Sequence, residues 1–184
     1  GPRFRAVLAS DIDASMLEIA RRNLSLLTEA GMRARTEQLR ELYAQFGKPS
    51  HREALESAAI LEGYRARGPI EAIEVFQADI TAGAPDFFRE GGFGPADIVI
   101  ADLPYGQLTG WRSGSADPAG MTLDSLLPCL KPGASVVALI ADKSLKPRHE
   151  RYRRVALLKA GKRQISLLEP IQARGTPGCA RRLQ

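Results

Sequence analysis

Short apolar runs alternate with longer segments of helical period along most of the chain. Several runs are rich in Val, Ile and Ala and have the length of buried strands, at residues 5–10, 71–77, 97–101 and 135–141. A hairpin is expected where residues 154–158 and 163–168 flank Ala160-Gly161. Strands that alternate with helices in this way predict an α/β sheet.

The segment after the first strand predicts a helix with Asp13 as its N-cap. Its apolar residues recur at helical spacing, at Leu17, Ala20, Leu24 and Leu27. From residue 31 to about 68 the chain is polar, and we expect a pair of helices near 35–46 and 50–65, separated at Pro49-Ser50. Further helices are expected near 85–89 and 121–130.

These elements fit one α/β domain over residues 1–170, with a helical insert at about 31–68. The tail, residues 171–184, has Gly, Pro and Arg but no apolar period, so we expect it to be mobile. The 184 residues are 44% hydrophobic and 26% charged, which suffices for a core in a soluble protein. The net charge of +5 is compatible with a nucleic-acid partner but does not require one.

The two cysteines, Cys129 and Cys179, have neither metal-ligand spacing nor redox-pair spacing. We therefore expect no metal site, and a reducing cytoplasm rather than an oxidising compartment. Cys129 lies in an apolar segment and is expected in the core. The sequence shows no apolar run of about 18 residues and no secretory signal, so no membrane association is expected.

The most informative stretch is Asp102-Leu103-Pro104-Tyr105-Gly106, which follows the apolar run 98–101. Open α/β sheets bind ligands at the carboxyl edge, where this stretch is expected to lie. A carboxylate accepts hydrogen bonds from a base edge, an aromatic ring stacks on a base, and proline stiffens the backbone between them. The simpler alternative is a strand-to-helix turn capped by the aspartate.

Two further acids follow predicted strands, Asp11 and Asp79. Each alone is more often the N-cap of the next helix than a ligand-binding group. The order of the signals is more specific, because the two acids precede the Asp-Leu-Pro-Tyr stretch.

In that order the chain resembles the class I S-adenosylmethionine-dependent methyltransferases, which have a Rossmann-like sheet. The stretch from Asp102 resembles their Asp/Asn/Ser-Pro-Pro-Tyr/Phe loop, with Leu103 in place of the first proline. Asp-Leu-Pro-Tyr/Phe-Gly is the form found in enzymes that methylate guanine in RNA. The resemblance is greatest to the avilamycin-resistance methyltransferases of 23S ribosomal RNA. It rests on Ala9-Ser10-Asp11-Ile12-Asp13, Asn23-Leu24, Phe46-Gly47-Lys48-Pro49-Ser50, the loop at Asp102 with Trp111, and Asp142-Lys143-Ser144.

The resemblance implies the site residues and the cofactor, S-adenosyl-L-methionine. Asp11, with Ile12 beside it, would hold the ribose hydroxyls. Asp79 would accept from the adenine amino group, with Ile80 beside the adenine ring. The catalytic loop would be Asp102, Leu103, Pro104 and Tyr105, with Asp102 facing both cofactor and base.

Candidate RNA contacts lie in three places, each with a plainer alternative. Trp111 covers the target base or is a partly buried anchor. A basic run contacts phosphates or is a solvated face; it comprises Lys143, Lys146, Arg148 and Arg151, then Arg153 and Arg154. Lys48 and Arg52 make the helical insert a further RNA candidate, and the alternative is a covering subdomain.

The first strand of this fold and its Gly-rich loop have no counterpart before Ala6. We therefore expect an N-terminally incomplete domain that binds the cofactor poorly by itself. The predicted function is methylation of a guanine in 23S rRNA or the large ribosomal subunit, at N1 rather than N2, linked by the resemblance to resistance against ribosome-targeting antibiotics. The alternatives are a transfer-RNA guanine-N2 methyltransferase and a non-catalytic RNA-binding remnant. The oligomeric state stays open.

Overall fold

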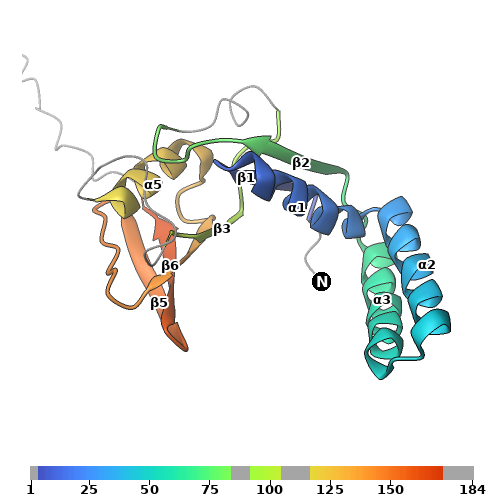
Figure 1. Ribbon diagram of the computed structural model, residues 1–184. Helices are drawn as coiled ribbons and strands as arrows, with labels where there is room; N and C mark the ends of the chain where they lie inside the picture. The colour runs from blue at the N-terminus through green and yellow to red at the C-terminus, as the bar shows by residue number, and fades with distance from the viewer. Residues whose placement is uncertain (1–3, 84–91, 105–116, 172–184) are drawn as a thin grey trace, which may run out of the picture. The chain divides into compact units, whose positions relative to one another are not determined.

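The computed structural model describes residues 4–83, 92–104 and 117–171 (Figure 1). The chain divides into two compact units, one up to Ala78 and one from Asp79 onward. Each unit has a sheet of its own. The expected helix near 85–89, most of the loop after Pro104 and the tail from residue 172 lie outside the described residues.

The first unit contains a two-stranded parallel sheet of β1 (Ala6–Asp11) and β2 (Ala72–Gln77). The two strands run in register, so Asp11 and Gln77 end them at the same edge. Helix α1 (Ala14–Leu24) follows β1 and buries Leu17. The carboxylate of Asp13 accepts a hydrogen bond from the Ser15 N–H, which confirms the predicted N-cap.

The predicted helical insert is an antiparallel pair, α2 (Glu29–Phe46) and α3 (Pro49–Arg67), after a short 3-10 turn, η1 (Ser25–Leu27) (Figure 1). Met32, Leu39 and Ala58 form its small core. Gly47 ends α2 with a φ of 59°, and proline at the first turn starts α3, as the sequence predicts.

Helix α2 begins six residues before its predicted start, because Thr28 caps it. The Thr28 hydroxyl accepts a hydrogen bond from the Gly31 N–H at 3.0 Å. Gly31 is therefore inside a helix, where glycine is normally unfavourable. A Cβ atom at this position would collide with the backbone carbonyl oxygen of Ser25, so the close approach of η1 to α2 requires glycine here.

We expect Gly31→Ala to destabilise the chain by about 1–3 kcal/mol, the usual cost of an added methyl group that has no room. Gly63→Ala is the matched control, since Gly63 lies in α3 and nothing stands within 4 Å of the place that its added methyl group would take. This second change should stabilise by about 0.5–1 kcal/mol through helix propensity. Urea unfolding followed by circular dichroism measures both, and a gain in stability in both variants would contradict the close-approach argument.

The second unit contains a four-stranded sheet in the order β3-β4-β6-β5. Its strands are β3 (Ile98–Asp102), β4 (Val136–Asp142), β5 (Tyr152–Ala160) and β6 (Arg163–Pro170). β3 is parallel to β4, and β6 is antiparallel to both β4 and β5. The carboxyl ends of β3, β4 and β5 therefore lie at one edge, and β6 starts there. Gly161, with a φ of 56°, makes the predicted hairpin turn between β5 and β6.

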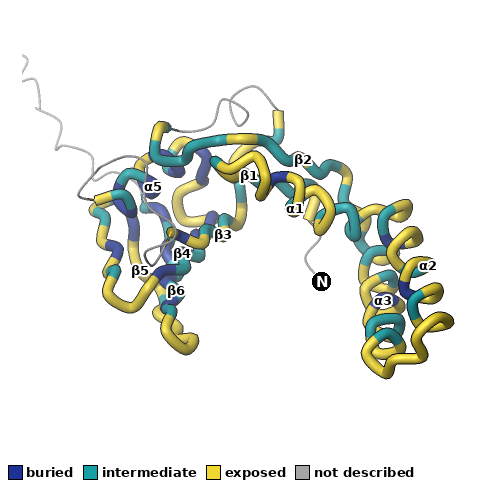
Figure 2. Tube along the Cα trace, viewed as in Figure 1, coloured by how far each residue is buried: buried dark blue, intermediate teal, exposed yellow. Residues whose placement is uncertain are grey.

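Helix α5 (Pro118–Leu126) and the turn η2 (Leu127–Cys129) pack with this sheet to form the main core. Leu123 of α5 and Val137 and Leu139 of β4 are almost completely buried, and Figure 2 shows the dark-blue buried positions along these elements. Cys129 is 2% exposed, which confirms its predicted place in the core. Within the described ranges, no helix combines the length and the apolarity that a membrane span needs.

Candidate active site at the carboxyl edge of the strands

Asp102 is the last residue of β3 and ends at the carboxyl edge, as predicted. Its Oδ2 accepts a hydrogen bond from Nη1 of Arg163 at 3.0 Å. The two side chains are 47% and 39% exposed, so the ion pair is accessible to a ligand. The sequence alone does not indicate a role for Arg163, because it lies 61 residues from Asp102 and only the strand register brings the two together.

Leu103 anchors the loop that follows Asp102. Its N–H donates to the Ile140 carbonyl oxygen at 2.9 Å, and its side chain is 3% exposed within the main core. This predicted catalytic residue therefore anchors the loop to the sheet, and its side chain packs in the main core. Pro104 is exposed. Tyr105 and Trp111 lie outside the described residues.

Asp142, at the end of β4, is a second carboxylate at this edge. Its Oδ1 accepts a hydrogen bond from the Ser144 N–H at 2.9 Å. This bond is the main reason why the pKa of Asp142 lies below its ordinary value. Asp142 therefore carries a charge that stabilises its own turn.

Asp11 ends β1 in the first unit, at the edge where the sequence predicts it. Its Oδ1 accepts from the Asp13 N–H at 2.8 Å, and its carbonyl oxygen accepts from the Ala78 N–H at 3.1 Å. The Gln77 amide also donates to the Ile12 carbonyl oxygen at 2.8 Å. These bonds fix a turn that presents an exposed carboxylate.

Asp79 forms a similar local turn at the start of the second unit. Its Oδ1 accepts from the N–H and the hydroxyl of Thr81, at 2.9 and 2.6 Å. Ile80 is partly buried against the main core. Asp79 and Asp102 belong to the second unit and Asp11 to the first, so a pocket shared by all three stays a prediction.

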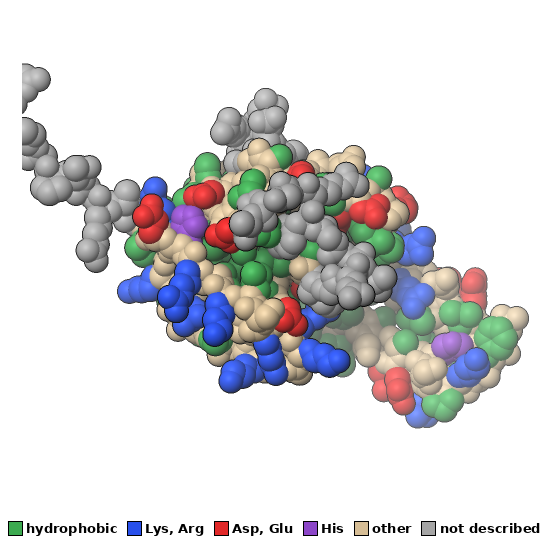
Figure 3. All heavy atoms as spheres, turned by 60° about the vertical axis from the view of Figure 1, so that its left-hand side comes forward, with side chains coloured by type: hydrophobic (Ala, Val, Ile, Leu, Met, Phe, Trp, Pro, Cys, Tyr) green, Lys and Arg blue, Asp and Glu red, His purple; other side chains and the backbone are tan. Residues whose placement is uncertain are grey.

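The predicted basic run begins at the carboxyl edge of the sheet and ends at the opposite edge. Lys143 lies in the turn directly after β4, and Lys146 and Arg148 are exposed farther along. Arg151 lies at the opposite edge, where its carbonyl oxygen accepts from the Ile171 N–H just after β6. Figure 3 shows Lys and Arg side chains gathered along one side of this unit.

His149 connects the segment between β4 and β5 to helix α5. The sequence alone gives this histidine no role. Its Nε2 is 2.9 Å from Oδ1 of Asp124, and its Nδ1 accepts from the Arg151 N–H. Its ring also meets that of Tyr152 edge-on, at 5.3 Å between centroids. The Tyr152 hydroxyl donates to the Leu123 carbonyl oxygen, and burial raises the pKa of this phenol.

The candidate RNA residues of the helical insert lie at the turn between α2 and α3. The Lys48 ammonium is 5.5 Å from the centre of the exposed Phe46 ring. Arg52 is exposed, with Nε 3.9 Å from a Glu56 carboxylate oxygen. This acidic neighbour lowers the local positive charge, so Lys48 is the better placed of the two for a phosphate.

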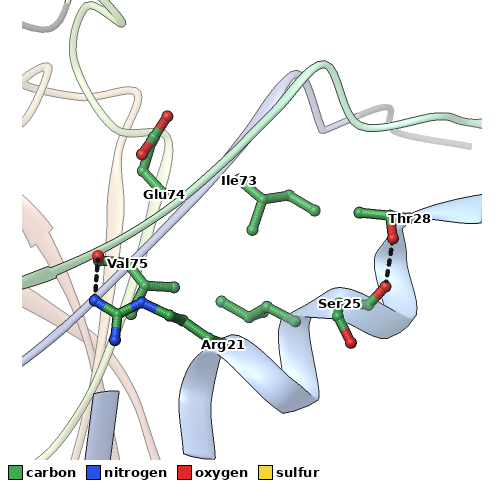
Figure 4. Close-up of a pocket in the computed structure, with 7 residues that line it drawn as sticks. Arg21, Ser25, Thr28, Ile73, Glu74 and Val75 are labelled. Atoms are coloured by element: carbon green, nitrogen blue, oxygen red, sulfur yellow. Dashed lines mark hydrogen bonds between the residues drawn. The ribbon is translucent and has the colours of Figure 1, made fainter. Parts of the chain in front are cut away.

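A shallow pocket in the first unit lies between α1, η1 and β2 (Figure 4). Arg21 crosses one end and donates to the Val75 carbonyl oxygen, and Ser25, Thr28 and Ile73 line the other end. It is lined by residues upstream of the carboxyl end of β2, and none of the predicted site residues lines it. The candidate site therefore lies at the strand ends and not in this pocket.

Comparison with known proteins adds an independent observation. A family model described as rRNA methyltransferase AviRa matches residues 1–163. A 23S rRNA (guanine(2535)-N(1))-methyltransferase from Streptomyces viridochromogenes is 37% identical over 167 residues, which cover 90% of this chain and 66% of that protein. Two solved structures of the rRNA methyltransferase aviRa from the same organism have TM-scores of 0.69 and 0.70, at 35% and 34% identity. Each covers 90% of this chain, which spans 66% of their length.

Proposed function

The chain belongs to the AviRa rRNA methyltransferase family, and from this premise we propose that it methylates a guanine base in 23S rRNA. The predicted fold class, an α/β sheet of the Rossmann-like class I methyltransferase type, is confirmed by the same similarity. The observation that carries the proposal is the exposed Asp102–Arg163 pair at the carboxyl edge.

The cofactor of this proposal is S-adenosyl-L-methionine, which supplies an electrophilic methyl group when it is bound. The residues present are suited to this cofactor. Asp11 offers an exposed carboxylate on a turn that is held by hydrogen bonds from the Asp13 N–H and the Gln77 amide. A carboxylate suits the two ribose hydroxyls. In the second unit, Asp79 would receive the adenine amino group, and Ile80 would present an apolar side chain beside the ring.

At the base, Asp102 would accept the proton that makes guanine N1 a poor nucleophile. The cofactor would supply the methyl group that N1 receives, and the N1 proton would pass to the Asp102 carboxylate. Transfer of this kind depends chiefly on alignment, so the anchoring of the loop by Leu103 would contribute to rate through position. Tyr105 would stack on the base, which must leave its helix.

The rest of the RNA would be held by positive charge. Lys143 is at the same edge as Asp102. Lys146 and Arg148 extend the positive charge along the segment between β4 and β5. Lys48 on the helical insert and Trp111 after the catalytic loop are further proposed contacts. Action on ribosomal RNA would place the protein in the cytoplasm, where a methylated ribosome could resist an antibiotic.

The test is methylation of 23S rRNA by the full-length protein with methyl-labelled cofactor. We expect label in one guanine, with a reverse-transcription stop at that position, because an N1 methyl group blocks the base-pairing edge. Label on N2 of a transfer-RNA guanine would favour the alternative substrate. RNA binding without cofactor binding in a calorimetric titration would favour a non-catalytic role.

We expect Asp11→Ala to weaken cofactor binding by about 1.5–3 kcal/mol, the scale for hydrogen bonds to a charged group. Asp11→Asn is the matched control for the fold, because its amide oxygen can still accept from the Asp13 N–H. Calorimetric titration of the full-length protein with S-adenosylmethionine measures the change. Unchanged affinity in Asp11→Ala, with an intact circular-dichroism spectrum, would remove Asp11 from the site.

A further inference from the structure

The arrangement of the strands places Arg163 on the same face of the sheet as Asp102. Asp102 pairs with Ile140 across β3 and β4, and Asp142, two residues after Ile140, pairs with Arg163 across β4 and β6. Residues two apart on a strand share a face, so all these side chains lie on one side. Arg163 therefore reaches Asp102 across the end of β4.

One contact of Arg163 reaches past the strand that its register pairs it with. Asp142 is its direct cross-strand partner, yet the carboxylate of Asp142 accepts from the Ser144 N–H. The Arg163 guanidinium donates to Asp102, which lies on the more distant strand β3. Ion pairs this exposed contribute little to stability, so holding the fold together is a weak reason for the contact.

The pair offers a hydrogen-bond acceptor directly beside a fork of donors. A guanidinium carries several N–H donors in one plane, and a carboxylate has two accepting oxygens. The pairing edge of guanine has the opposite order, with the O6 acceptor beside the N1–H and N2–H donors. Adenine has a donor at its 6 position and an acceptor at N1, so it would set donor against donor and acceptor against acceptor.

We propose that Arg163 and Asp102 together select guanine, with Arg163 donating to O6 while Asp102 accepts from N1–H. This inference rests on the proposed function and adds a specificity-determining residue to it. Loss of the N1 proton moves negative charge onto O6, so a guanidinium there also stabilises the charge that develops during methyl transfer. Both effects require contact with the base and would not follow from a purely structural ion pair.

The test compares guanine with 6-thioguanine at the methylated position of an RNA oligonucleotide. Sulfur is a weaker and larger acceptor than oxygen, while the N1 proton is kept. We measure kcat/KM for both RNAs with the full-length protein, its Arg163→Gln variant and its Arg163→Lys variant. Thio-substitution alters the intrinsic reactivity of N1 equally for every enzyme form, so the ratio of the two kcat/KM values isolates the contact with O6.

We expect Arg163→Gln to lower kcat/KM on guanine by about 10- to 100-fold, the scale of one good base contact. The guanine-to-thioguanine ratio should fall about tenfold or more in this variant and by less in Arg163→Lys, which keeps the charge but loses the fork. Lys162→Gln is the matched control, because it removes the same charge from the residue directly before Arg163. It should leave the ratio unchanged.

An unchanged ratio in both Arg163 variants would overturn the inference and leave Arg163 as a positioning residue for Asp102. If Arg163→Gln does not fold, as judged by circular dichroism, the ratio in Arg163→Lys decides. The proposed function is judged separately by the unaltered protein. Absence of methyl transfer to any 23S rRNA guanine would overturn that function, and with it this inference.

Discussion

Asp102→Ala in the full-length protein is expected to lower the turnover number on 23S rRNA by about 100- to 10,000-fold, the range for loss of a general base. Cofactor affinity should change far less, because the proposed role of this carboxylate is on the base, and Arg163 donates a hydrogen bond to it at the edge of the sheet. A methylation assay under saturating cofactor and RNA measures the effect, and calorimetry with S-adenosylmethionine checks the affinity.

Asp142→Ala is the matched control for Asp102→Ala. It also removes a carboxylate from the end of a neighbouring strand, but that carboxylate serves the Ser144 turn. We expect its turnover to stay within about tenfold of the unaltered protein, less than the smallest loss expected for a general base. Equal losses in the two variants would indicate a general effect of charge at this edge, and full activity of Asp102→Ala would refute the mechanism.

Leu139→Ala is expected to destabilise the chain by about 2–5 kcal/mol, the range for leucine truncation in a packed core. Leu139 is fully buried in β4, with Ala101 of β3 on one side and Ser166 of β6 on the other. Both neighbours are held in paired strands, so we expect the cavity left by the truncation to close only in part. β4 also pairs with the strand that ends in Asp102. The loss of stability should therefore lower both the urea midpoint of unfolding and the temperature at which methylation activity disappears.

Leu158→Ala is the control for the truncation of Leu139. The same side chain is lost from β5, where Leu158 is 51% exposed. The expected change is within about 0.5 kcal/mol, as for most surface substitutions. If urea unfolding gave similar values for the two variants, the cluster around Leu139 would not be the main source of stability.

The sequence predicts most of the secondary structure here, because the signals are local. The N-cap at Asp13, the break at Gly47 and the hairpin at Gly161 each depend on residues within one turn. The start of α2 is not predictable from the sequence, because it depends on a contact with residues outside that turn. Glycine at position 31 lowers helix propensity, and only the packing of Ser25 against this turn shows why glycine stands inside the helix.

The candidate site was predictable in part. The place of Asp102 follows from the apolar run before it, because a strand that ends in an acid puts that acid at a sheet edge. The sequence could not distinguish the side chain of Leu103, which packs in the core, from its exposed neighbours in the loop. Nor could it pair His149 with Asp124, since that contact joins a loop to a helix 25 residues away.

The sequence by itself determined which residues end the strands and which chemistry they offer, since hydrophobic period and turn residues act over a few positions. The tertiary structure alone decided that Arg163 meets Asp102 and that the basic segment crosses from one edge of the sheet to the other. Both depend on strand order and register. These are set by the packing of residues far apart in the chain, and a shift of one residue would turn each side chain to the opposite face.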